Sequence, residues 1–256
     1  MQRNKRKIPG KCAYQADLSY VHDAGFTGYV REAIPGLLKI LRQRGIKNGL
    51  VIDLGCGSGV WARALTLAGY EALGVDLSQE MLKLARKHAP KARFLRASLL
   101  DVELTSCQAV TAIGEPVNYL FDPRSSMAAL AKLFRRIHRA LLPGGVFVFD
   151  VATPGRSGQF GPVLKHVEGR DWALLFRTEE DRRSRILTRH MTIFRKVGRA
   201  YRRSSESHRL RLYTREQIER QLRAAGFEIQ VARSYGKSLP RPGLLVFIAA
   251  KCPARP

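Results

Sequence analysis

Long hydrophobic runs are missing from this 256-residue sequence. None of its apolar stretches approaches the roughly 18 residues that a membrane-spanning helix needs. The first residues, Met-Gln-Arg-Asn-Lys-Arg-Lys, are basic, but the apolar stretch of a secretion signal does not follow them. The sequence therefore predicts a cytoplasmic protein with no membrane association and with a disordered basic tail at its start.

Cysteine is scarce as well. The four cysteines, Cys12, Cys56, Cys107 and Cys252, are scattered and form no C-x-x-C pair, so neither a disulfide framework nor a metal site is predicted. This usage is typical of a reducing compartment such as the cytoplasm. Cys56 lies between two glycines, where a small side chain is needed, and we interpret it as a packing residue rather than a nucleophile.

Acidic residues are few: 21 Asp and Glu stand against 45 Lys and Arg, which gives a formal net charge of +24. Clustered basic residues bind nucleic acid by releasing its counterions, and residues 182–211 hold eleven Lys or Arg with one acid, Glu206. However, no run exceeds three consecutive basic residues, and the stretch has too few aromatic residues to stack bases. A solvated strand face is therefore favoured, and a nucleic-acid partner stays the alternative.

The most informative feature that is present lies at residues 50–59, where an apolar segment runs into Gly55-Cys-Gly-Ser-Gly59. This pattern predicts a buried strand, a glycine turn and a helix, and a second apolar segment then ends at the carboxylate of Asp76. Such a layout is typical of a nucleotide-binding crevice at the carboxyl ends of parallel strands, where the acid binds a ribose.

Two details separate this loop from a dinucleotide site. Val60 stands where the dinucleotide motif has its third glycine. Asp53, just before the loop, would repel a pyrophosphate but suits a cationic ligand. A nicotinamide oxidoreductase is therefore the least favoured interpretation.

Alternation of apolar segments with helical periods predicts an α/β fold with a doubly wound sheet. The expected strands are residues 50–54, 72–75, 93–95, 109–113, 146–150, 228–232 and 244–250, and the expected helices are residues 28–44, 60–68, 78–88, 125–142 and 214–226. Extended segments at residues 172–178, 186–194 and 200–212 are separated by charged turns and predict a small antiparallel β insertion.

Three segments in this order resemble the class I S-adenosylmethionine-dependent methyltransferases: residues 51–59, residues 74–78 and residues 141–149, which read Leu-Leu-Pro-Gly-Gly-Val-Phe-Val-Phe. The resemblance covers residues 14–150 and continues loosely to residue 250. It implies a Rossmann-like seven-stranded sheet whose last strand is reversed.

The resemblance also suggests how the chain is divided. Residues 28–155 and 212–252 are expected to form the cofactor-binding core. Residues 1–27 are expected to form the basic tail and a lid segment, and residues 156–211 an antiparallel β insertion that caps the substrate.

The same resemblance implies S-adenosylmethionine as the cofactor. The glycine loop would hold its amino-acid end, Asp76 its ribose, and Leu77 and Met81 its adenine. Ser98 stands where relatives often carry Asp, so a backbone contact to the adenine edge is expected there. The expected cofactor-binding residues are Asp53, Gly55, Cys56, Gly57, Gly59, Asp76, Leu77, Met81, Ser98, Leu99 and Gly114.

The loop after the fourth predicted strand, residues 114–119, lies at the edge of the sheet where the methyl group should project. It lacks the Asn/Asp-Pro-Pro-Tyr/Phe motif of enzymes that methylate DNA bases and is more similar to the loops of small-molecule methyltransferases. Glu115 is a candidate catalytic residue, and Asn118 and Tyr119 are candidate substrate residues. An equally favoured alternative is that Asn118 and Tyr119 only cap and pack the next turn.

A second candidate segment precedes the first strand. Residues 17–26 contain Tyr20 and Phe26 as candidate substrate residues and His22 as a candidate base, because histidine titrates near neutral pH. The alternative for His22 is a hydrogen-bonded structural role.

Strand alternation places Arg209, Arg211 and Tyr213 on one face of the insertion. Arg209 and Tyr213 are therefore further substrate candidates, because a basic face can anchor an anionic acceptor. The alternative is that this face is simply solvated. His208 is a weaker candidate to face the cleft from the same segment.

These observations favour a methyltransferase that transfers a methyl group to N or O of a small-molecule acceptor, as a monomer or homodimer. Methyl transfer depends mainly on orientation, so a general base is optional. One alternative is methylation of RNA or protein through residues 182–211. Another is a non-catalytic module that binds the cofactor and regulates a partner.

Overall fold

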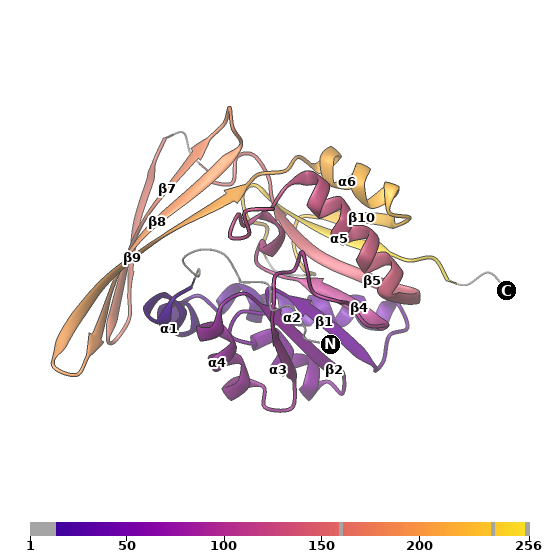
Figure 1. Ribbon diagram of the computed structural model, residues 1–256, viewed down its shortest axis with the longest axis horizontal. Coiled ribbons are helices and arrows are strands. Elements are labelled where there is room, and N and C mark those ends of the chain that lie inside the picture. The colour runs from indigo at the N-terminus through magenta and orange to yellow at the C-terminus, as the bar shows by residue number, and fades with distance from the viewer. Residues whose placement is uncertain (1–13, 159–160, 237–238, 254–256) are drawn as a thin grey trace, which may run out of the picture.

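Figure 1 shows the protein as a computed structural model, which describes residues 14–158, 161–236 and 239–253. The predicted basic tail and Cys12 lie outside these residues. A seven-stranded sheet and a four-stranded sheet make up the β structure of the described chain. In Figure 1 the four-stranded sheet projects from one side of the larger body.

The seven-stranded sheet has the order β10-β11-β5-β4-β1-β2-β3. Its strands are β1 (Leu50–Leu54), β2 (Glu71–Asp76), β3 (Arg93–Arg96), β4 (Cys107–Ala112), β5 (Leu141–Ala152), β10 (Glu228–Ala232) and β11 (Leu244–Ala250). Strand β11 is antiparallel to both β5 and β10, whereas β5, β4, β1, β2 and β3 pair in parallel. The predicted Rossmann-like sheet with a reversed last strand is confirmed.

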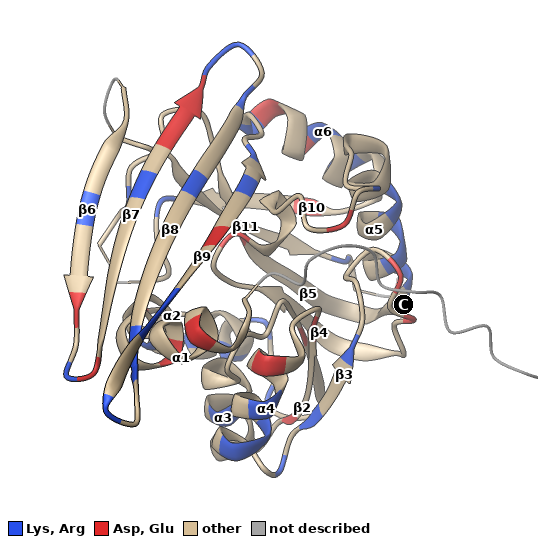
Figure 2. Ribbon diagram, turned by 60° about the vertical axis from the view of Figure 1, so that its left-hand side comes forward, with Lys and Arg blue, Asp and Glu red and all other residues tan. Residues whose placement is uncertain are grey.

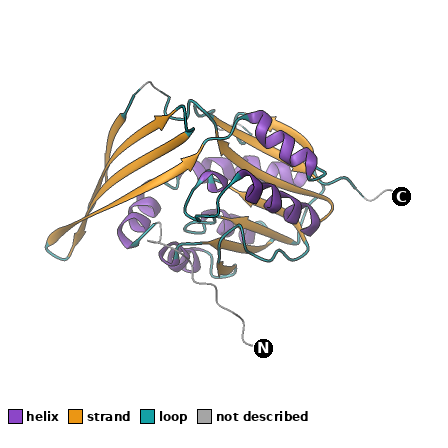
Figure 3. Ribbon diagram, turned by 45° about the horizontal axis from the view of Figure 1, so that its top comes forward, coloured by secondary structure: helices purple, strands orange, loops and turns teal. Residues whose placement is uncertain are grey.

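Helices cover both faces of this sheet, as Figure 3 shows. Helices α2 (Gly28–Gln43) and α3 (Val60–Leu67) pack on one face, and α4 (Gln79–His88) lies beside α3. Helices α5 (Met127–Ala140) and α6 (Arg215–Ala224) pack on the other. Thr214 caps α6 with Gln217 in the predicted capping box.

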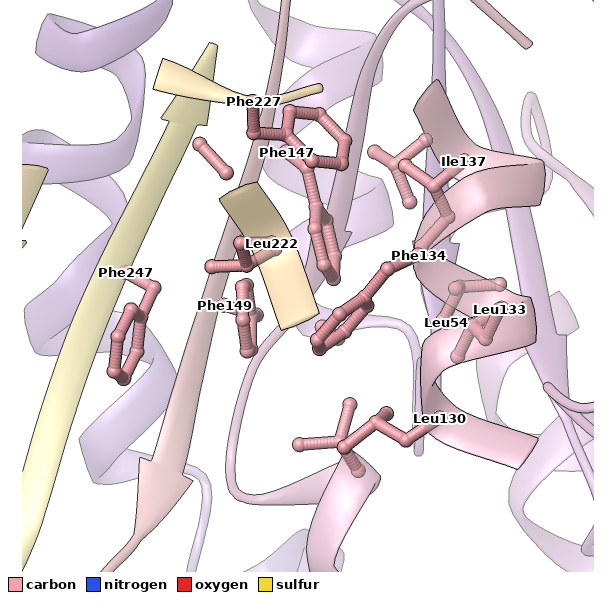
Figure 4. Packing of buried hydrophobic residues seen from close by; sticks show 14 of the residues in the cluster. Leu54, Leu130, Leu133, Phe134, Ile137, Phe147, Phe149, Leu222, Phe227 and Phe247 are labelled. Atoms are coloured by element: carbon pink, nitrogen blue, oxygen red, sulfur yellow. The ribbon is translucent and has the colours of Figure 1, made fainter. Parts of the chain in front are cut away.

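Successive residues of a strand point to opposite faces, and β5 shows how this fills both cores. Phe147 and Phe149 face the α5 and α6 side, where Figure 4 shows them beside Phe134 and Leu222, while Val148 joins the cluster under α2 and α3. Both phenylalanines are fully buried. Each such side chain stabilises the fold by about 1.5–3 kcal/mol.

Helix α5 ends at Ala140, two residues before the predicted end. Leu141 is extended and buried, and it pairs with Cys107 of β4. Pairing with the sheet therefore ends the helix before Pro143 is reached. The other predicted core elements differ from the observed ones only at their ends.

The four-stranded sheet is antiparallel throughout, in the order β6-β7-β8-β9. Its strands are β6 (Val163–Glu168), β7 (Trp172–Asp181), β8 (Ile186–Val197) and β9 (Ala200–Arg211). The predicted antiparallel insertion is confirmed, but strand β6 was not predicted. That strand lies at the edge and is mostly exposed, so it lacks the regular burial alternation that identifies a strand.

Helix α1 (Ala16–Gly25) packs against the four-stranded sheet. Its Leu18 and Val21 form a buried cluster with Trp172, Leu174 and Ile193 of β7 and β8. Gly25 allows the closest approach, because a Cβ there would lie 2.6 Å from the Trp172 ring. The predicted lid segment is therefore a helix attached to the insertion. Among the described residues, no helix combines the length and the apolar character of a membrane span.

Candidate active site

A cavity of about 190 Å³ opens at the carboxyl ends of β1, β2 and β4. The glycine loop, the loop after β4 and helix α1 surround it. It is lined by fourteen of the predicted residues: His22, Phe26, Asp53, Gly55, Cys56, Gly57, Asp76, Leu77, Met81, Ser98, Leu99, Gly114, Tyr119 and Tyr213. The structure thus brings together most of the predicted cofactor residues and part of the predicted substrate residues.

Five predicted residues do not line the cavity: Tyr20, Gly59, Glu115, Asn118 and Arg209. Each of them has a different environment, described below.

The glycine loop and Asp76 lie side by side in the wall of this cavity. The Gly57 N–H donates to Asp76 Oδ2 at 2.9 Å, and the Ser78 N–H donates to Oδ1 at 2.8 Å. Gly57 has a φ of +52°, and no atom lies within 4 Å of the position that a Cβ would take. The loop therefore leaves room for a ligand against its backbone, as a cradle for the cofactor requires.

Gly59 instead sits behind the cavity as the N-cap of α3, with a φ of +79°. A Cβ at Gly59 would lie 2.9 Å from Cα of Ala85 in α4. The third glycine of the motif thus allows two helices to approach, which is a packing role.

Asp53 is buried at the cavity wall. Its Oδ1 accepts a hydrogen bond from Thr111 Oγ1 at 2.8 Å, and that hydroxyl in turn accepts from Trp61 Nε1 at 3.1 Å. Burial disfavours the charged carboxylate and raises the pKa of Asp53 to about 7. The site therefore holds a carboxyl group that gains from the arrival of a cationic ligand.

At the end of β3, Ser98 contacts a residue that the sequence did not single out. Ser98 Oγ donates to Asp122 Oδ2 at 2.7 Å, and both residues line the cavity. Arg124 binds the same carboxylate and holds the pKa of Asp122 at about 2. No short motif marks Asp122, because it meets Ser98 from 24 residues away.

Aromatic side chains form the opposite wall. Tyr14 OH and Tyr119 OH are 3.2 Å apart, and Tyr119 stacks on Phe121 with ring centroids 4.6 Å apart. The His208 ring lies behind these three rings and is nearly fully buried. Tyr14 and Phe121 were missed in the sequence because a single aromatic residue in an irregular segment carries no pattern.

His22 lies between Tyr14 and Phe26 at the cavity. Its Nδ1 is buried and has no hydrogen-bond partner among the described residues. Burial lowers the pKa of His22 to about 4, so the ring is neutral at pH 7. A neutral ring with an unpaired nitrogen is suited to accept a hydrogen bond from a bound substrate.

Glu115 is buried just outside the cavity, with a φ of +66°. Arg156 Nε binds one carboxylate oxygen, and Arg189 Nη2 binds the other at 2.8 Å. These guanidinium groups keep the pKa of Glu115 below its usual range, although burial opposes them. Both oxygens are engaged, so the geometry gives Glu115 no path to an acceptor.

Arg189 extends this cluster to the cavity. Its Nη1 donates to Tyr119 OH at 3.2 Å, so a residue of β8 reaches the aromatic wall from the four-stranded sheet. Glu115 and Arg189 therefore act on the site by holding Tyr119.

Asn118 is completely buried and bridges the two sheets. Its side-chain amide donates to the carbonyl oxygens of Ala152 and Arg211 and accepts from the Ala152 N–H. The alternative that Asn118 has a structural role fits this geometry.

The charged side of α1 fixes the helix to the sheet. Asp17 forms ion pairs with Arg195 and Arg202, and Tyr20 OH donates to Asp171 at 2.6 Å. Tyr20, predicted as a substrate residue, is thereby directed away from the cavity.

The prediction that Arg209, Arg211 and Tyr213 share a face is wrong for Tyr213. Arg209 is exposed on β9, whereas its neighbours His208 and Leu210 point inward. Strand β9 ends at Arg211, and the Tyr213 N–H donates to Ala152 of β5. Alternation stops where the chain leaves one sheet for the other, so Tyr213 faces the cavity and Arg209 does not.

Asp150, at the end of β5, joins several walls of the site and was also missed. It accepts hydrogen bonds from the Gly114 N–H, from Tyr29 OH at 2.8 Å and from Tyr235 OH at 2.9 Å. Burial raises the pKa of Asp150 to about 6.

The basic stretch at residues 182–211 forms β8, β9 and their turns. Arg189, Arg195 and Arg202 from this stretch pair with acids that lie inside the structure. Figure 2 shows Lys and Arg spread over α4, α5 and the four-stranded sheet rather than gathered on one element. Among the residues that the structure describes, no group of three His, Cys, Asp or Glu is placed to hold a metal ion.

Comparison with known proteins adds to this geometry. The family described as "Methyltransferase domain" matches residues 51–145. A curated relative from Streptomyces fradiae, dTDP-3-amino-3,6-dideoxy-alpha-D-glucopyranose N,N-dimethyltransferase, is 29% identical over 86% of this chain and 85% of its own length.

Solved structures share the whole fold. An S-adenosylmethionine-dependent methyltransferase from Clostridium acetobutylicum matches with a TM-score of 0.78 at 20% identity, covering 91% of this chain and 97% of that one. The sugar N-methyltransferase KedS8 from a Streptoalloteichus species matches with a TM-score of 0.75 at 22% identity, covering 98% of this chain and 99% of that one. Fold, glycine loop and family match all indicate an S-adenosylmethionine-dependent methyltransferase of class I.

Proposed function

We propose that this enzyme methylates the amino nitrogen of a small sugar-like acceptor, in the manner that the names of its relatives describe. S-adenosylmethionine supplies a methyl group that is already activated by its sulfonium centre. The protein then has to bind both reactants, exclude water and orient the nucleophile, and orientation alone can supply about 7–11 kcal/mol.

The cofactor half of the cavity supports this proposal. Asp76 faces the open backbone of Gly57, and Asp53 is a buried acid that suits a cationic ligand. We assign the ribose to Asp76 and the amino-acid end to the loop at residues 55–57. Leu77 and Met81 provide an apolar slot for the base.

The acceptor half is the aromatic wall with His22, and this wall is the observation that carries the proposal. An amine must be neutral to attack a methyl group, and the neutral His22 with its unpaired Nδ1 can accept one of the amine hydrogens. Tyr14 and Tyr119 offer two further hydroxyls. Aromatic rings with a few polar groups are typical of small-molecule sites.

The names of the relatives support nitrogen over oxygen. Two relatives that align with more than four fifths of this chain act on amino sugars linked to dTDP by name, and both are named N,N-dimethyltransferases. O-methyltransferases of ubiquinone biosynthesis reach 32% identity but cover only about two fifths of the chain.

The test is a methylation assay with dTDP-3-amino-3,6-dideoxy-glucose as the probe, followed by mass spectrometry. We expect products with one and two added methyl groups. Binding of S-adenosylhomocysteine without transfer to this or to any other amino sugar tested would overturn the acceptor class. Methyl incorporation into RNA, with binding that weakens steeply as salt rises, would favour the nucleic-acid alternative instead.

A further inference from the structure

Two tyrosine hydroxyls meet at the aromatic wall of the cavity, and a cation from the four-stranded sheet contacts one of them. Tyr14 OH and Tyr119 OH are 3.2 Å apart, and both residues line the cavity. Arg189 Nη1 donates to Tyr119 OH at 3.2 Å, while its Nη2 donates to Glu115 at 2.8 Å. These groups therefore form a hydrogen-bond network that starts at the ion pair of Glu115 and ends at the cavity.

The hydrogens of this network can be counted. A guanidinium group has only donors, and each tyrosine hydroxyl has one hydrogen. The Tyr119 oxygen therefore accepts from Arg189, and the bond between the two hydroxyls uses one of their two hydrogens. Among the described residues, neither hydroxyl has another partner. Whichever way the central bond runs, one O–H group is left to donate into the cavity.

The charge of Arg189 decides which hydroxyl this is. An oxygen that accepts from a cation becomes a poorer acceptor, and its own hydrogen becomes a better donor. Tyr119 OH therefore donates to Tyr14 OH, and the hydrogen of Tyr14 is the one that is left. Burial raises the pKa of Tyr14 well above its usual range, so this hydrogen stays in place at neutral pH.

The backbone around both tyrosines is fixed as well. Tyr14 has a φ of +54°, its N–H donates to Glu206 at 2.8 Å, and its carbonyl oxygen accepts from Ser78 Oγ at 2.7 Å. Tyr119 forms an antiparallel bridge with Leu210 of β9. The Tyr14 hydroxyl is thus positioned before a substrate arrives, which lowers the entropy cost of orienting that substrate.

His22 supplies the complementary group. Its ring centroid lies 5.3 Å from that of Tyr14, and its Nδ1 is the unpaired nitrogen described above. The acceptor half therefore offers a hydrogen-bond acceptor beside a hydrogen-bond donor. An amine whose neighbouring carbon carries a hydroxyl group has the matching pair, because its N–H donates and its oxygen accepts.

We propose that the substrate is a vicinal amino alcohol, in which Tyr14 donates to the oxygen while His22 accepts from the amine, and this inference rests on the proposed function. Arg189 and Tyr119 are positioning residues that keep the Tyr14 hydroxyl a donor. An amine whose neighbouring carbons carry only hydrogen leaves this donor without a partner and is therefore a poor substrate.

Steady-state kinetics with three amino sugars tests this. In dTDP-3-amino-3,6-dideoxy-glucose both carbons beside the amine carry a hydroxyl. The 4-deoxy counterpart, dTDP-3-amino-3,4,6-trideoxy-glucose, lacks one of them, and the 2-deoxy counterpart lacks the other. One deoxy compound should lose about tenfold in kcat/KM, the factor expected for a donor left unpaired, and the other should lose less than about threefold.

Tyr14→Phe should remove this discrimination, because it removes the donating hydrogen. The kcat/KM for the compound with both hydroxyls should fall by about tenfold, to that of the disfavoured deoxy compound. The kcat/KM for the disfavoured compound should stay close to its wild-type value. Binding of S-adenosylhomocysteine, measured by calorimetry, should not change.

Two further variants test the positioning role. Tyr119→Phe removes the link to Arg189 but not the Glu115–Arg189 ion pair, so the Tyr14 hydroxyl can turn its hydrogen either way. The discrimination should then fall to about threefold. Tyr20→Phe is the matched control, because this hydroxyl donates to Asp171 instead of the cavity, and it should discriminate like the wild type.

The outcomes separate the inference from the proposed function. Transfer to none of the three sugars would overturn both. Transfer to all three with equal kcat/KM, or discrimination that persists in Tyr14→Phe, would overturn the inference and leave the proposed function standing. Equal loss of discrimination in Tyr20→Phe would assign the effect to the packing of α1 and also overturn it. Full discrimination in Tyr119→Phe would contradict the role of Arg189, and Tyr14→Phe remains decisive if Tyr119→Phe fails to fold.

Discussion

The two halves of the cavity are built in opposite ways. The half around Gly57 and Asp76 comes from short, consecutive segments at the ends of neighbouring parallel strands. The half around Tyr14 and Tyr119 combines segments that are distant in sequence, as the hydrogen bond from the Tyr14 N–H to Glu206, 192 positions away, shows. Cavity residues that come from one turn of chain leave a motif in the sequence, whereas cavity residues that are assembled across two sheets do not.

The largest effect should come from the ion-pair cluster of Glu115, Arg156 and Arg189 beside Tyr119. Glu115→Ala removes a buried carboxylate and leaves the half-buried Arg156 and Arg189 without their common partner. Breaking a buried ion pair in this way costs about 3–5 kcal/mol, and urea unfolding would measure the loss. Glu179→Ala, which removes an exposed partner of Arg177, is the matched control and should cost less than about 1 kcal/mol. Equal losses would contradict the structural role of Glu115.

The next effect concerns the cofactor half alone. Asp76→Ala removes the acceptor of the Gly57 and Ser78 N–H groups together with the proposed ribose contact. Binding of S-adenosylhomocysteine should weaken roughly 100-fold, about 2.7 kcal/mol, as measured by calorimetry. Glu71→Ala, which changes an exposed acid at the opposite end of β2, should bind like the wild type. If Asp76→Ala binds as tightly as the wild type, the ribose lies elsewhere.

A pH dependence should distinguish the acid of the cofactor half. Burial raises the pKa of Asp53 to about 7, against about 3.9 in an unfolded chain. Without ligand, the stability from this bound proton is present below pH 4 and is lost as the pH rises through about 7. S-adenosylmethionine is cationic and favours the ionised acid, so its binding should tighten by up to about tenfold per pH unit below pH 7 and then level off.

Calorimetry in two buffers of different ionisation enthalpy would detect the proton that leaves Asp53 on binding. In Asp53→Asn both the proton release and the slope should disappear. A slope that survives in this variant would assign the proton to another group, such as Asp150 with its pKa of about 6.

A smaller effect is expected in the acceptor half. His22→Ala removes one hydrogen-bond acceptor from the proposed amine site, so turnover should fall by roughly tenfold while S-adenosylhomocysteine binding stays unchanged. Because the pKa of His22 lies at about 4, the rate should show no titration of this residue between pH 6 and 8. A wild-type titration in that range that vanishes in His22→Ala would show that His22 acts as a base of ordinary pKa.

The smallest effect is expected on β9, where two neighbouring residues test which face of the strand contacts the cavity wall. Arg209→Ala alters an exposed side chain, so the free energy of unfolding should change by less than about 0.5 kcal/mol. The KM for the acceptor should stay close to that of the wild type. His208→Ala, one position earlier, removes a buried ring from behind Tyr14, Tyr119 and Phe121 and should lower the melting temperature. If Arg209→Ala raises KM strongly, the exposed face takes part in acceptor binding.

The sequence predicted the cofactor half of the cavity better than the acceptor half. The seven-stranded sheet, its reversed last strand and most of the residues around the cofactor half were expected, because buried parallel strands are continuously apolar and a glycine turn repeats a fixed spacing. The family and its cofactor were expected from the resemblance of residues 51–59, 74–78 and 141–149 to known methyltransferases. The individual roles of these residues, like the cytoplasmic location, stay predictions.

The acceptor half was predicted less well. His22, Phe26, Tyr119 and Tyr213 line the cavity, whereas Tyr20, Glu115 and Asn118 bind other parts of the protein and Arg209 is exposed. Polar side chains in loops have several partners within reach, and local sequence does not rank them. Tyr14, Phe121 and Asp122 were missed for the converse reason, since each one gains its neighbours only through folding.

The sequence by itself determined the core, because the alternation of apolar strands, glycine turns and amphipathic helices is a local property of the chain. Tertiary structure alone decided which side chains meet across the cavity: it pairs Glu115 with Arg189 of another sheet, Asp122 with Ser98, and α1 with β7 and β8. The physical reason is that burial and charge pairing depend on neighbours brought from far along the chain. Their partners are therefore fixed only once both sheets are formed.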